Sequence, residues 1–233
     1  MTELHRPPIT IVRNPLKRTV DSVLSGIGLV VLAPFMLVIG VVIMRGSPGG
    51  MFYSQMRVGR AGVLFRCYKF RTMVAGADKL GGSITIKNDS RITRIGQFLR
   101  RTKLDELPQL WNVLRGEMSL VGSRPEVPSV VAHYTAEQWH VFAIRPGITS
   151  LATLHLRDEE AMLALAKDPD TAYETEFVPL KIRLAMTHVY RNSVIYDTYI
   201  LLLTVWAVIF RFLPVKEHPE VAHLRDRLMR GEV

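Results

Sequence analysis

The sequence has almost no cysteine. Cys67 is the single one among 233 residues, so no disulfide can form within the chain, and this cysteine usage fits a cytoplasmic fold. Cys67 lies in a strand-like stretch with no histidine near it in the sequence. A catalytic thiol is commonly activated by a histidine base, so Cys67 is not favoured as a nucleophile.

Acidic residues are in the minority. The chain has 30 Lys and Arg against 21 Asp and Glu, a formal net charge of +9. Such a balance suits nucleic acid, anionic lipid headgroups or phosphorylated small molecules as partners. The sequence contains no helix-turn-helix pattern, zinc-ligand spacing or aromatic RNA-binding signature, so nothing singles out nucleic acid.

Charge is absent altogether from residues 22–44. As a helix this run would reach about 35 Å, which is enough to cross a bilayer core. It is too long for a secretory signal peptide, and no small-residue cleavage site follows it.

Pro34 lies near the middle of this run, where it removes a backbone hydrogen bond and bends a helix. Both flanks are basic, whereas the positive-inside rule favours an excess on one side. We therefore expect a re-entrant helix that turns at Pro34 and leaves on the face it entered, with a plain crossing as the alternative. The flanking cations are Arg13, Lys17 and Arg18 before the run and Arg45, Arg57, Arg60, Arg66, Lys69 and Arg71 after it.

Residues 51–58 and 63–70 are typical of two short strands, and the glycine-containing segment 59–62 between them predicts a hairpin. The second strand carries Arg66, Lys69 and Arg71. These cations fit either a solvated edge strand that contacts lipid headgroups or a phosphate cradle.

A basic helix is expected next, capped by Asp89 or Ser90 and buried through Ile92, Ile95 and Leu99. Its arginines lie outside the apolar stripe, at positions 91, 94, 100 and 101.

Asp105 and Glu106 form an acidic pair directly after these cations. Leu107, Leu110, Trp111 and Leu114 follow at the spacing of one helix face. Pro108 is tolerated if that helix starts near Asp105, which would put both carboxylates at the positive end of the helix dipole. This position favours an anion or a metal-bound phosphate, although a simple N-cap is the structural alternative.

Two Arg-Pro turns follow, at Arg124-Pro125 and Arg145-Pro146. Arginine is suited to bidentate contacts with phosphate. Two such turns after an acidic pair predict a diphosphate site. The candidate phosphate-binding cations are Lys69, Arg71, Arg100, Arg124 and Arg145.

Residues 158–192 are expected to be helical. The uncharged part of a second apolar stretch, 198–210, is too short to span a bilayer comfortably, so an interfacial or buried helix is expected there. The tail from residue 214 is basic and amphipathic through Val221, Leu224 and Leu228, which fits either membrane contact or self-association.

The expected fold class is a mainly helical α/β (α+β) protein associated with a membrane. Three parts are expected. They are a basic N-terminus with a re-entrant helix hairpin broken at Pro34 (1–45), a small catalytic domain with a short β-hairpin (46–193), and an interfacial helix with a basic tail (194–233).

Five stretches, in order, resemble the monotopic phosphoglycosyl transferases, the bacterial polyprenyl-phosphate sugar-1-phosphate transferases. They are 68–73 (YKFRTM), 89–96 (DSRITRIG), 104–112 (LDELPQLWN), 118–126 (MSLVGSRPE) and 145–149 (RPGIT). With the proline-containing N-terminal helix they cover nearly the whole chain. Each stretch is a weak signal alone, whereas five in order are specific.

The resemblance implies transfer of sugar-1-phosphate from a nucleoside diphosphate sugar, usually a UDP-sugar, to undecaprenyl phosphate, with release of UMP. It implies that Asp105 is the nucleophile of a covalent phosphosugar intermediate. It also implies that Glu106, with Asp105, holds Mg2+. The implied location is the cytoplasmic face of the bacterial inner membrane, in the assembly of a surface glycan such as an exopolysaccharide.

The chain departs from the family pattern at several positions, and these changes leave the sugar open. They are Ala33 for a common serine, Ser123 for a common proline, 150–154 (SLATL) for a run with glycine and glutamine, and Ala185 for an acidic residue. The oligomeric state is also open. The alternatives are a membrane-tethered binding protein for anionic lipid or nucleic acid, or an inactive scaffold of a glycan assembly complex.

Overall fold

A computed structural model describes residues 7–77, 80, 85, 89–209 and 217–233. The end of the expected second apolar stretch, 210–213, and the start of the tail lie outside these ranges. The helices of the first half are α1 (Pro15–Gly46), α2 (Arg94–Thr102), α3 (Gln109–Arg115) and α4 (Pro128–Val131). Those of the second half are α5 (Leu151–His155), α6 (Glu159–Leu163), α7 (Pro169–Ala172), α8 (Val178–Arg191), α9 (Val194–Ile209) and α10 (Pro219–Met229).

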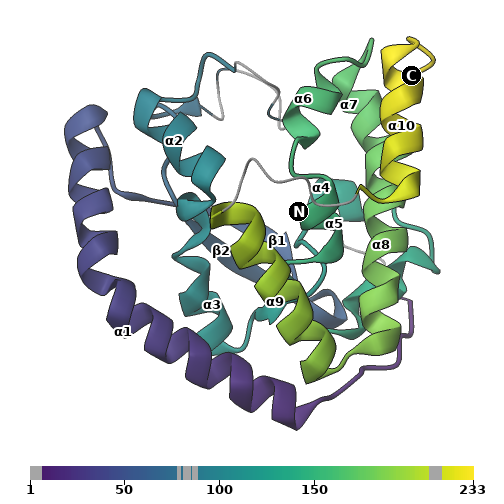
Figure 1. Cartoon of the computed structure of the whole chain (residues 1–233), viewed down its shortest axis with the longest axis horizontal. Coiled ribbons are helices and arrows are strands. Elements are labelled where there is room, and N and C mark those ends of the chain that lie inside the picture. The colour runs from purple at the N-terminus through teal and green to yellow at the C-terminus, as the bar shows by residue number, and fades with distance from the viewer. Residues whose placement is uncertain (1–6, 78–79, 81–84, 86–88, 210–216) are drawn as a thin grey trace.

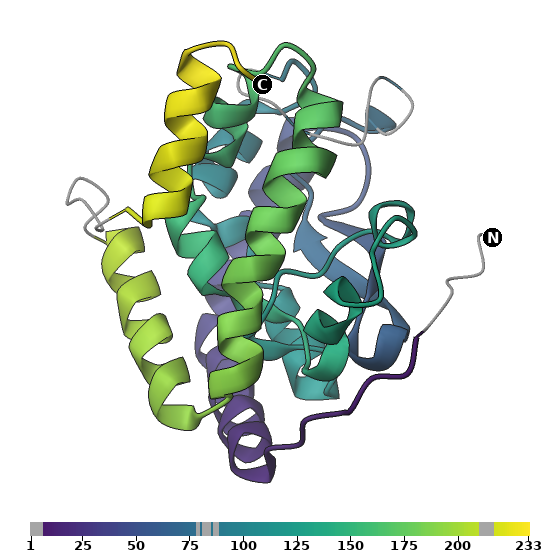
Figure 2. The same cartoon turned by 90° about the vertical axis from the view of Figure 1, so that its right-hand side faces the viewer.

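The strands form two small sheets. β1 (Phe52–Val58) and β2 (Leu64–Phe70) are antiparallel, and β3 (Ser119–Val121) pairs in parallel with β4 (Gly147–Thr149). The expected hairpin is confirmed, with Phe52 opposite Phe70 and Val58 opposite Leu64. Figure 2 shows the hairpin and α9 on opposite sides of the molecule. A mainly helical fold with a small sheet is therefore confirmed.

Helix α1 runs along one edge of the molecule and then turns up its side (Figure 1). It is one continuous helix of 32 residues with Pro34 inside it. In the described part of the chain it is the one helix long and apolar enough to cross a membrane, and 17% of its most apolar window is buried. The two arms expected around Pro34 therefore form one bent helix, and entry into and exit from a bilayer stays a prediction.

The first two turns of α1 are fastened to the rest of the protein by charged side chains. Lys17 donates to the carbonyl of Val121 at 2.9 Å and pairs with Asp197 of α9. Asp21 accepts from the hydroxyl of Ser119 at 2.7 Å and from the backbone N–H of Leu120 at 3.2 Å. Helix α1 thus holds strand β3, which leads into the Arg124 turn.

Arg18, on the same turn of α1, holds the helix that follows the acidic pair. Its guanidinium donates to the carbonyls of Val113 and Leu114, at the end of α3, at 2.6 and 2.8 Å. The last carbonyls of a helix lack the usual helical partners, and here Val113 accepts in addition the N–H of the C-cap residue Gly116 at 2.9 Å. Arg18 thus helps to satisfy the C-terminus of α3.

The expected cap of α2 is corrected. The hydroxyl of Thr93, not Asp89 or Ser90, accepts the N–H of Gly96 at 3.0 Å, while Asp89 pairs with Arg91. The physical reason is an extended segment before the helix. Ile92 bridges Met73, and the N–H of Thr93 donates to the carbonyl of Thr72 at 3.0 Å.

The C-terminal helix α10 packs into the protein's own core. Its three apolar residues, Val221, Leu224 and Leu228, are buried in a cluster with Phe177 and Leu180. This packing corrects the expectation that the apolar face of the tail contacts a membrane or a second copy.

Helix α9 has both a buried and an exposed side. Ile200 is fully buried, whereas Ile195, Leu202, Val205 and Trp206 are exposed. Such an apolar exposed side is typical of a helix at a membrane interface.

Candidate active site

Asp105 and Glu106 lie in a 3-10 turn, η3 (Leu104–Glu106), between α2 and α3. The expectation of one helix that starts near Asp105 is wrong, because α3 starts at Gln109 with Pro108 as its N-cap. Lys103, at φ 59°, ends α2 in the left-handed conformation and turns the chain. The carboxylates are therefore held by a tight turn and not by a helix terminus.

The buried side of α3 is polar as well as apolar. Its buried residues are Gln109, Asn112 and Val113, whereas Trp111, expected on the apolar face, is 47% exposed. The Asn112 side chain accepts from the N–H of Tyr68 at 3.1 Å and donates to the carbonyl of Arg66 at 2.7 Å. Asn112 thus attaches α3, the helix after the dyad (Asp105 and Glu106), to β2, the strand that carries Lys69.

Glu106 is buried and doubly paired. Its Oε1 accepts from Lys69 Nζ at 2.9 Å and from Arg124 at 3.0 Å. Burial alone would raise the pKa of Glu106, but the charges of Lys69 and Arg124 outweigh it and hold that pKa well below its ordinary value. The charge of Glu106 in turn raises the pKa of Arg124. Glu106 therefore stays ionised and fixes two cations.

Asp105 is equally buried, at 6% exposure, but its Oδ1 has no hydrogen-bond partner among the described residues. Burial raises the pKa of Asp105 and the charge of Glu106 adds to the rise, while Lys69 opposes it. An unpaired, desolvated carboxylate oxygen beside fixed cations is suited to attack an electrophilic phosphorus.

Three of the five candidate cations are brought to the dyad. Lys69 and Arg124 bind Glu106, and Arg100 is close enough for its charge to lower the pKa of Asp105. Arg100 also donates to the hydroxyl of Thr72 at 3.0 Å and to Glu160 at 2.9 Å. That these three cations bind phosphate stays a prediction.

The other two candidate cations have different surroundings. Arg71 donates to the carbonyls of Ser47 and Pro48, both at 2.8 Å, and so holds the turn that follows α1. Arg145 donates to the carbonyl of Gly116 at 2.8 Å. Burial and the nearby charges of Arg60 and Arg18 lower the pKa of Arg145.

Sequence reasoning missed a buried network next to Arg124. Glu126, 6% exposed, accepts the hydroxyl of Tyr173 at 2.9 Å, and Lys181 lies 3.8 Å away. Lys181 also binds Glu159 of α6 at 2.6 Å. Glu126 adjoins the Arg124 turn in the sequence, but nothing in the pattern of 158–192 points to Tyr173 or Lys181.

The dyad offers carboxylate oxygens to a metal ion. Among the described residues no group of three or more His, Cys, Asp or Glu side chains is placed to hold a metal ion, so a metal ion at this site would have the two carboxylates of Asp105 and Glu106 as its protein ligands. Mg2+ is commonly held by one or two carboxylates, with water and substrate phosphates as its other ligands. The unpaired Oδ1 of Asp105 fits that arrangement.

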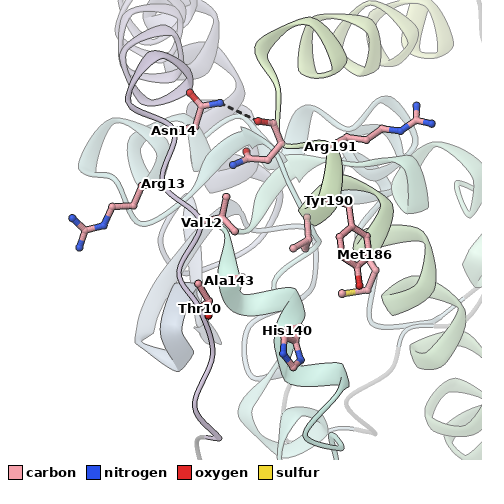
Figure 3. A pocket seen from close by; sticks show the side chains of 11 residues that line it. Thr10, Val12, Arg13, Asn14, His140, Ala143, Met186, Tyr190 and Arg191 are labelled. Atoms are coloured by element: carbon pink, nitrogen blue, oxygen red, sulfur yellow. Dashed lines mark hydrogen bonds between the residues drawn. The ribbon is translucent and has the colours of Figure 1, made fainter.

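A separate cavity of about 500 Å3 lies between the segment before α1 and the end of α8. The Asn14 side chain donates a hydrogen bond to the carbonyl of Asn192 at 3.0 Å. Figure 3 shows this hydrogen bond as a dashed line from Asn14, and Arg13 and Arg191 pointing away from each other. No residue of the dyad lines this cavity, so it is distinct from the carboxylate site.

Comparison with known proteins gives the family. A family model described as bacterial sugar transferase matches residues 12–211. The chain belongs to the bacterial sugar transferase family, as the five sequence stretches indicate.

Three relatives have descriptive names. The undecaprenyl-phosphate galactose phosphotransferase of Salmonella typhimurium is 40% identical over 151 residues, which are 58% of this chain and 32% of that protein. The UDP-galactose-lipid carrier transferase of Erwinia amylovora is 41% identical over 58% of this chain and 31% of its own length. The UDP-glucose:undecaprenyl-phosphate glucose-1-phosphate transferase of Xanthomonas campestris is 44% identical over 58% of this chain and 29% of its own length. The chain thus spans about a third of the length of these relatives.

Proposed function

We propose that this protein transfers sugar-1-phosphate from a UDP-sugar to undecaprenyl phosphate and releases UMP, as the first membrane step of surface glycan assembly. The family and the names of the relatives support the reaction class. The observation that carries the mechanism is the contrast within the dyad. Glu106 binds Lys69 and Arg124 through Oε1, while Asp105 keeps an unpaired buried oxygen, Oδ1.

In the first step an ionised oxygen of Asp105 attacks the phosphorus next to the sugar. The bond from that phosphorus to the UMP oxygen breaks, UMP leaves with its electron pair, and a sugar phosphate remains on Asp105. In this mechanism Lys69 and Arg124, which bind Glu106, stabilise the charge that builds on the phosphoryl oxygens.

In the second step a phosphate oxygen of undecaprenyl phosphate attacks the same phosphorus. The bond to the Asp105 oxygen breaks, which regenerates the carboxylate and yields the lipid-linked sugar diphosphate. Mg2+, held by Asp105 and Glu106 when bound, would neutralise phosphate charge during these steps.

We place the protein at the bacterial inner membrane, with its catalytic part on the cytoplasmic side. The lipid substrate is confined to the bilayer, and α1 and α9 both expose large apolar side chains. In this arrangement α1 enters the bilayer, bends at Pro34 and leaves on the same face.

An intact-mass and UMP-release assay tests the chemistry. The protein is held in nanodiscs with Mg2+ and a panel of UDP-sugars, without lipid acceptor, beside Asp105→Asn. A mass gain of one sugar phosphate with UMP release in the wild type alone supports Asp105 as nucleophile and identifies the sugar. UMP release that needs the lipid and never gives an adduct would contradict the covalent step. No reaction with any sugar would favour a binding or scaffold role.

Cysteine labelling tests the membrane arrangement. Cys67 is buried, so Arg13→Cys and Gly50→Cys place single exposed thiols on either side of α1. In sealed inside-out vesicles a membrane-impermeant maleimide should label both positions. Labelling of one alone would mean that α1 crosses the bilayer.

A further inference from the structure

The ion pair between Arg100 and Glu160 joins two elements on either side of the upper part of the molecule, α2 and α6 (Figure 1). Arg100 NH1 lies 2.9 Å from Glu160 Oε1, and its Nε donates to Thr72 at 3.0 Å. The same guanidinium is close enough to Asp105 for its charge to act on it. The carbonyl of Arg100 also accepts the N–H of Lys103 at 3.2 Å, directly before the turn that carries Asp105 and Glu106. Arg100 therefore lies next to the dyad in the fold.

The pairing of Arg100 differs from that of the other candidate cations. Lys69 and Arg124 bind Glu106, whose side chain is 6% exposed, and Arg71 and Arg145 bind backbone carbonyls. The side chain of Glu160 is 47% exposed. An exposed ion pair contributes little stability, so among the five candidate cations Arg100 has the partner that an incoming anion displaces most readily.

Helix α6 carries a fixed and a movable carboxylate side by side. Glu159 binds Lys181 at 2.6 Å, with exposed fractions of 23% and 11%. This more deeply buried contact holds α6 to α8. Release of Glu160 from Arg100 therefore needs a change of one side chain and leaves α6 in place.

We infer that the carboxylate of Glu160 binds Arg100 at the position that the substrate diphosphate takes, and that a nucleoside diphosphate displaces Glu160 when it binds. The inference rests on the proposed function, since it takes the anion to be the diphosphate of the nucleotide sugar. Glu160 in this role sets a threshold for binding. An anion has to neutralise Arg100 better than one carboxylate does, which favours a diphosphate over singly charged anions.

Binding of inorganic pyrophosphate to the full-length protein in nanodiscs, measured by calorimetry at fixed ionic strength, tests this role. In Glu160→Gln the Kd is expected to fall about fivefold. The variant removes the charge that competes for Arg100, and an exposed ion pair stabilises by an amount that changes a Kd by at most about this factor. The matched control is Glu220→Gln, which takes the same charge from another half-exposed Glu–Arg pair, that with Arg183 at 2.8 Å. Its Kd is expected to equal that of the wild type. An unchanged or higher Kd in Glu160→Gln would overturn the inference.

A double-variant comparison separates displacement from a general charge effect. Arg100→Gln is expected to raise the Kd about tenfold, the size of a lost charge-assisted hydrogen bond. In that background Glu160→Gln should bring no further gain, since there is no guanidinium to release. A fivefold gain there as well would show a general effect of charge and refute the role of Glu160.

The same variants in the UMP-release assay distinguish the two proposals. Pyrophosphate results as expected, without UMP release from any UDP-sugar, would support the Glu160 role and contradict the transferase. UMP release together with equal pyrophosphate affinities in wild type and Glu160→Gln would support the transferase and overturn the Glu160 role.

Discussion

Asp105 and Glu106 are consecutive residues of one turn, and their carboxylates have opposite environments. The Oε1 of Glu106 receives two cations, at 2.9 and 3.0 Å, while the Oδ1 of Asp105 has no partner among the described residues. Both side chains are buried. The pKa of Glu106 is lowered and that of Asp105 is raised. One carboxylate thus organises the cations and the other is left reactive.

Asp105→Asn is expected to abolish transfer and to stabilise the fold by about 1–2 kcal/mol at neutral pH, because it removes a buried unpaired charge. Burial raises the pKa of Asp105 above 3.8, so its ionised form destabilises the folded state above that raised pKa. The gain should therefore fade as the pH falls towards 3.8. Thermal unfolding in chelator-containing buffer measures it. A variant less stable than the wild type at neutral pH would contradict this account.

Glu106→Gln is expected to destabilise the protein by about 2–3 kcal/mol, because Lys69 and Arg124 then face each other without a counter-charge. Burial would raise the pKa of Glu106, but the two cations lower it below 4.5. The stabilisation is therefore full above pH 4.5 and is lost as the pH falls through the lowered pKa. Adding Arg124→Met should recover part of the loss in thermal unfolding, and no recovery would argue against charge repulsion as the cause.

Gly96→Ala tests the close packing of α2 against the backbone of Thr72. A Cβ at this position would lie 1.9 Å from the carbonyl oxygen of Thr72, so the helix has to move away from the strand that precedes it. We expect a loss of about 1–3 kcal/mol. Activity should also fall, since Thr72 holds Arg100. The control is Gly50→Ala, where nothing lies within 4 Å. Equal stability of the two variants in thermal unfolding would refute the contact.

Lys17→Met tests the attachment of α1. Lys17 and Asp197 are both 9% exposed, and His188 lies 3.0 Å from Asp197. Loss of one partner from a buried pair costs about 3–5 kcal/mol, whereas apolar replacement of both is often close to neutral. The double variant Lys17→Met/Asp197→Leu should therefore unfold at a higher temperature than Lys17→Met. The same or a lower unfolding temperature would contradict an electrostatic role.

Local patterns in the sequence predicted much of the fold. Alternation and the glycines of 59–62 predicted the β-hairpin, and the uncharged run predicted the long helix α1. The acidic pair, Lys69 and Arg124 were each selected from short motifs, and the structure brings them together. These features were predictable because each depends on neighbours within a few residues or on a motif shared by a family.

Long-range pairing was not predictable in this way. Asp21 lies just before the uncharged run, and no pattern near it predicts a partner. In the structure it binds Ser119 and Leu120, which are 98 and 99 residues further along the chain. The predicted start of α3 near Asp105 was wrong, because the chain makes a turn between Lys103 and Pro108. The spacing of hydrophobic residues does not predict such a turn. No sequence motif contains Glu160 or Lys181. Their contacts with Arg100 and Glu159 form only because the fold brings α6 close to α2 and α8.

The fastening of α1 has a consequence for the order of biosynthesis. Lys17 and Asp21 are made before their partners, which lie 98 to 180 positions further along the chain. Synthesis runs from the N-terminus at about 5–20 residues per second, so these charges wait on the order of ten seconds before β3 and α9 emerge. During synthesis the charged residues at the start of α1 therefore lack their partners, and the cost of burying an unpaired charge favours keeping that end of the helix in water until β3 and α9 have been made.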